Sequence, residues 1–89
     1  DNLYFKISKH AIDMALKLKQ AFINKGYQLY LDSPTNQQFF VMHNDKIKQL
    51  SQHVKFSQWK KYDHNHKIVR FATSRSTTDN DIATLIDYI

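Results

Sequence analysis

The chain has 89 residues, 42% of them hydrophobic and 13% aromatic, with one Gly, one Pro and no Cys. This length predicts one domain with too little room for both a cofactor cavity and the walls that would close it, so we do not expect a complete enzyme. Thirteen basic and eight acidic residues give a net charge of +5, which attracts polyanions in general, and the lack of Cys excludes disulfides and thiolate chemistry.

The first half of the chain predicts one long helix and two strands. Apolar residues recur at steps of three and four over residues 4–25, as in an amphipathic helix, and Gly26 follows where a left-handed cap suits glycine. Alternation over residues 27–31 predicts a half-buried strand that ends in a turn at 32–34. Aromatic and β-branched residues over 38–42 predict the second strand.

The middle of the chain predicts a short helix, a strand and a loop. Asn44 is a good N-cap, and the helix after it would turn three apolar residues inward, namely Ile47, Leu50 and Val54. Residues 54–59 alternate in the way a strand does. The polar residues 60–67 are typical of a loop.

The last third of the chain predicts the strongest strand and a closing helix. Residues 67–73 alternate, with Val69, Phe71 and Thr73 on one face and Ile68, Arg70 and Ala72 on the other. Thr78 and Asp81 have a spacing close to that of a capping box. The helix that follows would have one apolar face, formed by Ile82, Leu85, Ile86 and Ile89.

The predicted order of elements is α-β-β-α-β-β-α, within a single domain over residues 1–89. Short links between strands favour an α+β fold, in which two longer helices pack on one face of a small antiparallel or mixed sheet of three to four strands. The chain starts without Met, and its last helical pattern runs to the final residue. We therefore expect a domain excised from a longer protein.

Five histidines raise the question of a metal site, and an extended backbone would put His64 and His66 on the same side. A third ligand is missing, and the sequence has neither Cys nor a His-Glu-x-x-His spacing. We therefore predict no metal site and interpret these two histidines as part of a solvated loop.

Basic and aromatic residues together raise the question of nucleic-acid binding, because exposed aromatics stack on bases and Lys binds phosphates. The candidate aromatics are Tyr27, Tyr30, Phe39, Phe40, Phe56, Trp59 and Phe71. Most occupy strand positions where an aromatic usually belongs to the core, and no ribonucleoprotein motif accompanies them. A stand-alone basic α+β module that binds nucleic acid or another polyanion stays as the alternative function, and a purely structural oligomerisation domain as a third.

Arg70 is the unusual residue of the strand over 67–73, because a charged side chain there would be half-buried in a sheet. A buried guanidinium needs an anionic partner, and its planar fork suits a carboxylate. An internal ion pair with Asp32 or Asp63 would also satisfy it. The residues just after the strand are typical of a polar turn and helix cap; they are Thr73, Ser74, Ser76 and Thr77.

Three segments then resemble a known family in their residues, order and spacing. They are 33–39 (Ser-Pro-Thr-Asn-Gln-Gln-Phe), 56–59 (Phe-Ser-Gln-Trp) and 69–74 (Val-Arg-Phe-Ala-Thr-Ser), the last followed by Thr77. The family that they resemble is the low-specificity threonine aldolase and β-eliminating lyase family, in its C-terminal small domain. Residues 3–11 and 14–18 fit the same pattern, so the resemblance covers essentially the whole chain.

The resemblance implies a part of a fold-type I pyridoxal-phosphate enzyme. In that family the large domain binds the cofactor, which acts as an electron sink, and the small domain contributes an arginine that binds the substrate α-carboxylate. By motif this arginine is Arg70. The parent enzyme would cleave threonine to glycine and acetaldehyde, and the chain alone would be inactive. Asn36, Gln37, Thr73 and Ser74 are implied as supporting residues around the site.

Further expectations about the parent follow from the same resemblance. Its partners would be an amino-acid substrate, the large domain of the same chain and further copies in a homo-oligomer, without nucleic acid or membrane. Independently of the resemblance, no signal peptide or bilayer-spanning apolar run is recognisable, and we expect a cytoplasmic location. Arg75 and Ser76 depart from the family, which often has an aromatic and a small residue there, so the preferred amino acid stays open.

Overall fold

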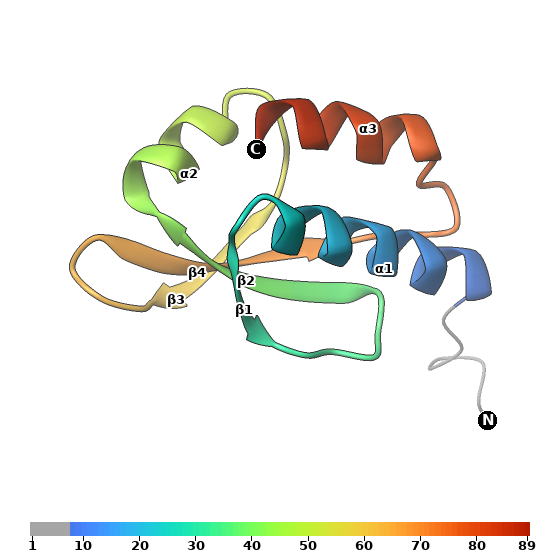
Figure 1. The fold of residues 1–89 in the computed structure, drawn as a ribbon, viewed down its shortest axis with the longest axis horizontal. Coiled ribbons are helices and arrows are strands. Elements are labelled where there is room, and N and C mark those ends of the chain that lie inside the picture. The colour runs from blue at the N-terminus through green and yellow to red at the C-terminus, as the bar shows by residue number, and fades with distance from the viewer. Residues whose placement is uncertain (1–7) are drawn as a thin grey trace.

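A computed structural model of the protein describes residues 8–89 (Figure 1). Its helices are α1 (Lys9–Asn24), α2 (Asn44–Leu50) and α3 (Asp79–Tyr88), and its strands are β1 (Gln28–Leu31), β2 (Gln37–His43), β3 (Ser57–Lys61) and β4 (His66–Ala72). The order of elements is the predicted one. The predicted helical residues 4–7 and the motif residues 3–7 lie outside the described residues. Ser8, which the predicted helix included, is instead the extended N-cap of α1, so the helix begins at Lys9.

The four strands form one antiparallel sheet in the order β1-β2-β4-β3. All three helices lie on one face of this sheet, and within residues 8–89 no helix covers the other face (Figure 1). The predicted α+β class and the one-sided helix layer are confirmed. Of the two sheet types that we expected, antiparallel or mixed, the chain adopts the first.

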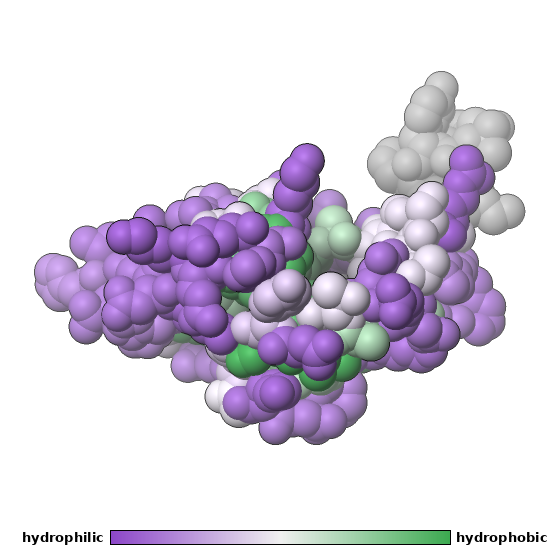
Figure 2. Space-filling model, turned by 90° about the horizontal axis from the view of Figure 1, so that it is seen from above, coloured by the Kyte–Doolittle hydropathy of each residue, from purple (hydrophilic) through white to green (hydrophobic). Residues whose placement is uncertain are grey.

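The core lies between the sheet and the helices. Phe22 of α1 and Phe40 of β2 are fully buried, and their rings stack with 4.2 Å between centroids. The other buried members of this cluster are Met14, Leu18, Met42, Ile47, Leu50, Val69, Phe71, Ile82 and Leu85. The helices present their polar faces to solvent, so the surface seen from the helix side is largely hydrophilic (Figure 2).

The end of α1 confirms the cap predicted at Gly26. The Tyr27 N–H donates to the Phe22 carbonyl at 3.0 Å and the Gly26 N–H to the Ile23 carbonyl at 3.0 Å, which together form a Schellman motif. Gly26 has φ of 91°, in the left-handed region. The Tyr27 ring lies 5.2 Å from the Phe22 ring and supplies the apolar contact that accompanies such caps.

Gly26→Ala should lower the free energy of unfolding by about 1 kcal/mol, because an L-residue is disfavoured at positive φ. Among residues 8–89, and apart from the two chain neighbours of Gly26, no heavy atom lies within 4 Å of the place that a new Cβ would take, so this loss would come from the backbone and not from crowding. Gly26→Asn should lose less, since Asn tolerates this conformation better. Urea unfolding of the three proteins measures the effect, and an Ala variant as stable as the original would contradict it.

The region over 57–67 differs from the prediction. The strand expected at 54–59 begins later, as β3 (Ser57–Lys61), and the loop expected at 60–67 is mostly a hairpin with β4, in which Lys60 pairs with Ile68 and Lys61 with Lys67. The polar residues from 60 onward were wrongly assigned to a loop because β3 is an edge strand. An edge strand with exposed side chains needs no apolar alternation to pair through its backbone.

The start of α2 also differs by one residue. The N-cap is His43, whose Nδ1 accepts a hydrogen bond from the Asp45 N–H at 3.0 Å, and Asn44 is the first helical residue. Ile47 and Leu50 are buried as expected. Val54 lies beyond the end of the helix and packs against the core from the following loop.

The start of α3 confirms the expected cap. Thr78 and Asp81 form a capping box, each side chain accepting a hydrogen bond from the backbone N–H of the other. Next to it, the Lys17 ammonium pairs with the Asp79 carboxylate and joins α1 to α3. The hydrogen bond from Lys17, and then its charge, lower the pKa of Asp79 below its ordinary value.

This ion pair predicts a pH dependence of stability with a defined sign. Because the pKa of Asp79 is lower in the folded state, the pair stabilises the fold above the ordinary carboxyl pKa of about 3.9, and this contribution is lost as the pH falls through the lowered value. Asp79→Asn and Lys17→Met should each weaken the acid dependence of the urea midpoint. An unchanged dependence in both variants would show that the pair does not form in solution.

Candidate functional site

Arg70 lies in the middle of β4 on the face of the sheet that no helix covers in residues 8–89. Its neighbours along the strand, Val69 and Phe71, are buried in the core, so the alternation of a strand turns Arg70 to the opposite face. Its direct cross-strand neighbours are Phe39 of β2 and Ser57 of β3. The side chain of Arg70 is half-buried there, as the sequence predicted.

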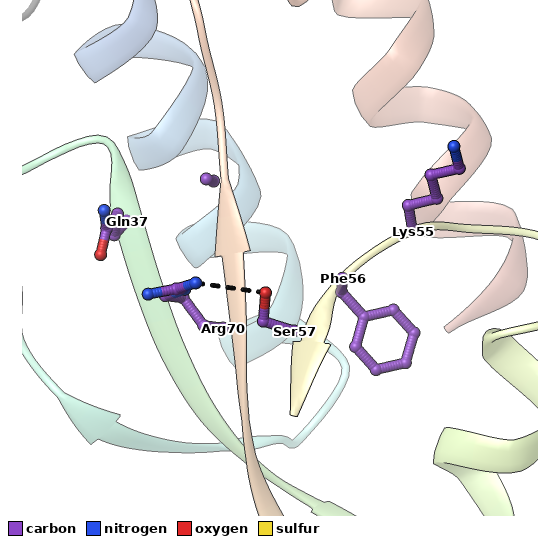
Figure 3. Close-up of a pocket in the computed structure, with 6 residues that line it drawn as sticks. Gln37, Lys55, Phe56, Ser57 and Arg70 are labelled. Carbon is purple, nitrogen blue, oxygen red and sulfur yellow. Dashed lines mark hydrogen bonds between the residues drawn. The ribbon is translucent and has the colours of Figure 1, made fainter. Parts of the chain in front are cut away.

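The guanidinium of Arg70 makes one hydrogen bond to the described part of the protein, from Nη2 to Ser57 Oγ at 3.2 Å (Figure 3). Within residues 8–89 no carboxylate lies within ion-pair distance of it. Asp32 instead pairs with Lys19 at 2.7 Å, and Asp63 with His66 at 2.9 Å. The internal ion pair of Arg70 that the sequence left open is therefore wrong for both candidate acids.

The contact with His66 changes the pKa of Asp63. The hydrogen bond with His66, together with one from the Asn65 N–H, lowers the pKa of Asp63. His66 in turn lies across the sheet from His43, with 5.1 Å between ring centroids. Within the described residues, no group of three or more His, Cys, Asp or Glu side chains is placed to hold a metal ion.

An open pocket of about 330 Å³ surrounds the Arg70 side chain. It is lined by Gln37, Lys55, Phe56, Ser57, Arg70 and Ala72. Figure 3 shows that Arg70 and Ser57 point toward one another from neighbouring strands, whereas Lys55 extends away from Arg70. Two cationic side chains and no acidic one line this pocket, so its chemistry suits an anion.

The free donors of Arg70 fit a carboxylate in particular. A guanidinium carries five N–H donors in a fixed fork, and Ser57 accepts from one of them. The others make no hydrogen bond to an acceptor among residues 8–89 and can bind both oxygens of a carboxylate in parallel. The pocket does not fit pyridoxal phosphate itself, because no acidic residue lines it to face a pyridine nitrogen.

Asn36 and Thr73 lie close together and do not line this pocket themselves, although their chain neighbours Gln37 and Ala72 do. The Asn36 side-chain amide donates to the Thr73 carbonyl at 2.6 Å, and the Thr73 N–H donates to the Asn36 carbonyl at 3.0 Å. The buried Thr73 hydroxyl donates to the carbonyl of Ala11 in α1. These contacts tie the start of β2, the end of β4 and α1 together.

Of the predicted site residues, the structure brings Arg70 and Gln37 into one pocket. Ser74 lies in the exposed turn before α3, where its N–H donates to Thr77 Oγ1 at 2.9 Å and its Oγ accepts from the Ser76 N–H at 3.1 Å. Sequence reasoning missed Ser57 as a site residue. The sequence feature that could have indicated Ser57 is its place in the 56–59 motif. That motif alone did not show that its strand pairs with the strand of Arg70.

Aromatic side chains adjoin Arg70 on the same face of the sheet. The Phe39 and Trp59 rings lie 5.2 Å apart and the Tyr30 and Trp59 rings 5.9 Å apart. The Lys60 ammonium lies 4.8 Å from the centroid of the Trp59 ring. Tyr30 and Trp59 are exposed, in contrast to Phe40 and Phe71, whose predicted core positions are confirmed.

No protein-family model and no curated protein sequence matches the chain. Among solved structures, a threonine aldolase from Leishmania major is similar, with a TM-score of 0.85 and 26% identity over 98% of this chain and 25% of that chain. A serine palmitoyltransferase from Sphingomonas wittichii has a TM-score of 0.71 and 10% identity over 89% of this chain and 22% of that chain. The chain therefore spans about a quarter of the length of the threonine aldolase.

The two likenesses have different weight. The second, at 10% identity, shows a shared fold alone, whereas the first extends over nearly the whole chain with 26% identity. In fold and in sequence the chain is thus similar to the small C-terminal domain of the threonine aldolase family, as its motifs predicted.

Proposed function

We propose that the chain is the C-terminal small domain of a longer pyridoxal-phosphate-dependent lyase that cleaves β-hydroxy amino acids, with threonine giving glycine and acetaldehyde. In this enzyme Arg70 binds the substrate carboxylate. The observation that carries the proposal is the open pocket at Arg70, where the guanidinium has no carboxylate partner among residues 8–89. The likeness to the Leishmania threonine aldolase supports the reaction class.

The role of Arg70 would be to bind and orient. Two parallel N–H donors hold a carboxylate at a fixed angle, and a fixed carboxylate sets the direction of the remaining bonds at Cα. β4 is a central strand paired on both sides, which gives the side chain a rigid base. Gln37 lines the same pocket, and Asn36 and Thr73 hold the ends of β2 and β4 that flank it. Ser74 would support the site through the turn after β4.

The cofactor and the other partners belong, in this proposal, to the rest of the longer protein. The pocket at Arg70 lacks the groups that pyridoxal phosphate needs, so a large domain of the same chain would bind it and face the open side of the sheet. That protein would be a homo-oligomer in the cytoplasm. Within residues 8–89, no helix combines the length and the apolar character needed to cross a bilayer.

The 89-residue chain and the full-length protein should therefore behave differently. We expect the 89-residue chain to cause no shift in the absorbance of pyridoxal phosphate and to release no glycine from threonine. The full-length protein should shift the cofactor absorbance and release glycine. Absorbance spectra and glycine assays on the two proteins measure this. Specific cofactor binding by the 89-residue chain would count strongly against the proposal.

A second candidate function is a stand-alone module that binds nucleic acid or another polyanion. The observation in its favour is the exposed pair Tyr30 and Trp59 with Lys60 beside them, on an open sheet face of a protein with a net charge of +5. Binding of mixed oligonucleotides over a salt series discriminates the two functions. Useful affinity at about 150 mM salt with a steep salt dependence would favour the module.

A further inference from the structure

We propose that Ser57 is a positioning residue, which holds the guanidinium of Arg70 in the orientation that receives the substrate carboxylate. This inference rests on the proposed function of Arg70. The carrying observation is that Ser57 Oγ accepts the one hydrogen bond that Arg70 donates within the described residues, at 3.2 Å from Nη2 (Figure 3).

The backbone places Ser57 for this role. Ser57 and Arg70 are direct partners across β3 and β4, so their side chains leave the sheet on the same face. The register of this strand pair shifts only later, between Gln58 and Lys60. Just before Ser57, the Phe56 ring stacks on Phe71 with 5.0 Å between centroids and anchors the start of β3 to the core. The edge strand is therefore well defined at Ser57.

The chemistry of the fork gives the hydrogen bond a directional effect. A guanidinium offers two forks to a carboxylate, one formed by both Nη groups and one by Nε with Nη2. Nη2 contributes one N–H to each fork, so the bond to Ser57 uses one fork and leaves the other complete for a ligand. Gln37, on the other side of the pocket, makes no hydrogen bond to Arg70. Ser57 thus selects the fork that is presented.

The side chain of Ser57 is partly exposed, and its hydroxyl makes no other hydrogen bond within residues 8–89. Removing this hydroxyl therefore creates no cavity in the core, and Ser57→Ala should fold as the unsubstituted chain does. Ser57→Thr keeps the hydroxyl and suits a strand. Ser51→Ala is a matched control, because it removes an exposed serine hydroxyl that donates to the Lys48 carbonyl at the end of α2 and does not line the pocket at Arg70.

The test is a double-mutant cycle on the full-length protein. Ser57→Ala should raise the KM for threonine about 3- to 10-fold, as expected for one hydrogen bond, with a smaller change in kcat. Ser57→Thr should stay near the original values, and so should Ser51→Ala. In an Arg70→Ala background, Ser57→Ala should have no further effect, because the group that it orients is gone.

A second readout needs no catalysis. In the 89-residue chain, Ser57→Ala should increase the mobility of the Arg70 Nε–H in NMR relaxation measurements, and Ser57→Thr should not. If Arg70→Ala leaves the kinetics unchanged, the proposed function fails. If Arg70→Ala impairs the enzyme but Ser57→Ala does not, or adds its full effect to that of Arg70→Ala, or leaves Arg70 as rigid as before, the positioning role of Ser57 alone is overturned.

Discussion

Replacing Arg70 by alanine in the full-length protein should lower kcat/KM for threonine by about 100-fold or more. Two charge-assisted hydrogen bonds to a carboxylate are lost, and hydrogen bonds to charged groups contribute about 1.5–3 kcal/mol each. The half-buried position of Arg70 between β2 and β3 keeps this contribution from being fully screened by solvent. Steady-state kinetics over a range of threonine concentrations measures the loss.

Arg70→Lys should recover little of that loss. A lysine ammonium keeps the charge, but it has neither the planar fork nor the reach of a guanidinium, so the parallel pair of hydrogen bonds is not restored. Arg75→Ala is the matched control, since Arg75 lies exposed in the turn after β4 and lines no part of the pocket. We expect it to keep the original kinetics. Original kinetics in Arg70→Ala would remove Arg70 from the substrate site.

Phe22→Ala should lower the free energy of unfolding by about 3–5 kcal/mol, the usual cost of removing a buried phenylalanine. The ring of Phe22 is fully buried and contacts three other aromatic rings, those of Tyr27, Phe40 and Phe71. A domain of this size has a total stability of about 5–15 kcal/mol, so a large share would be lost. Urea unfolding followed by circular dichroism measures the change.

Leu16→Ala offers the control for this substitution. Leu16 belongs to the same helix α1, is also a large apolar residue and is 48% exposed. Its replacement by alanine should change stability by less than about 0.5 kcal/mol, as for most surface positions. Equal losses for Phe22→Ala and Leu16→Ala would mean that the helix does not pack on the sheet through the face described above.

Local patterns in the sequence were sufficient for most of the fold. The helical period over α1, the glycine cap at Gly26 and the capping box at Thr78 each depend on residues close in the chain, and each is found as predicted. β3 was misplaced because its exposed residues carry no apolar pattern of their own. The bounds of β3 depend on its pairing with β4, and a prediction from residues close in the chain does not include that pairing.

The same division holds for the site. A charged residue between Val69 and Phe71 pointed to Arg70, and the structure places it half-buried on the open face. Whether Asp32 or Asp63 would neutralise it depended on distances across the fold. In the structure Asp32 pairs with Lys19 and Asp63 with His66. The role of Ser57 was hidden for a similar reason, because its contact with Arg70 spans 13 residues and two strands.

The most direct test of the central claim compares the full-length protein with a version that lacks these 89 residues, both supplied with pyridoxal phosphate and threonine. We expect the full-length protein to release glycine and acetaldehyde in equal amounts. The shortened version should keep the cofactor absorbance but release no glycine. Glycine release by the shortened version at the full-length rate, or none by a full-length protein loaded with cofactor, would show that the proposed function is wrong.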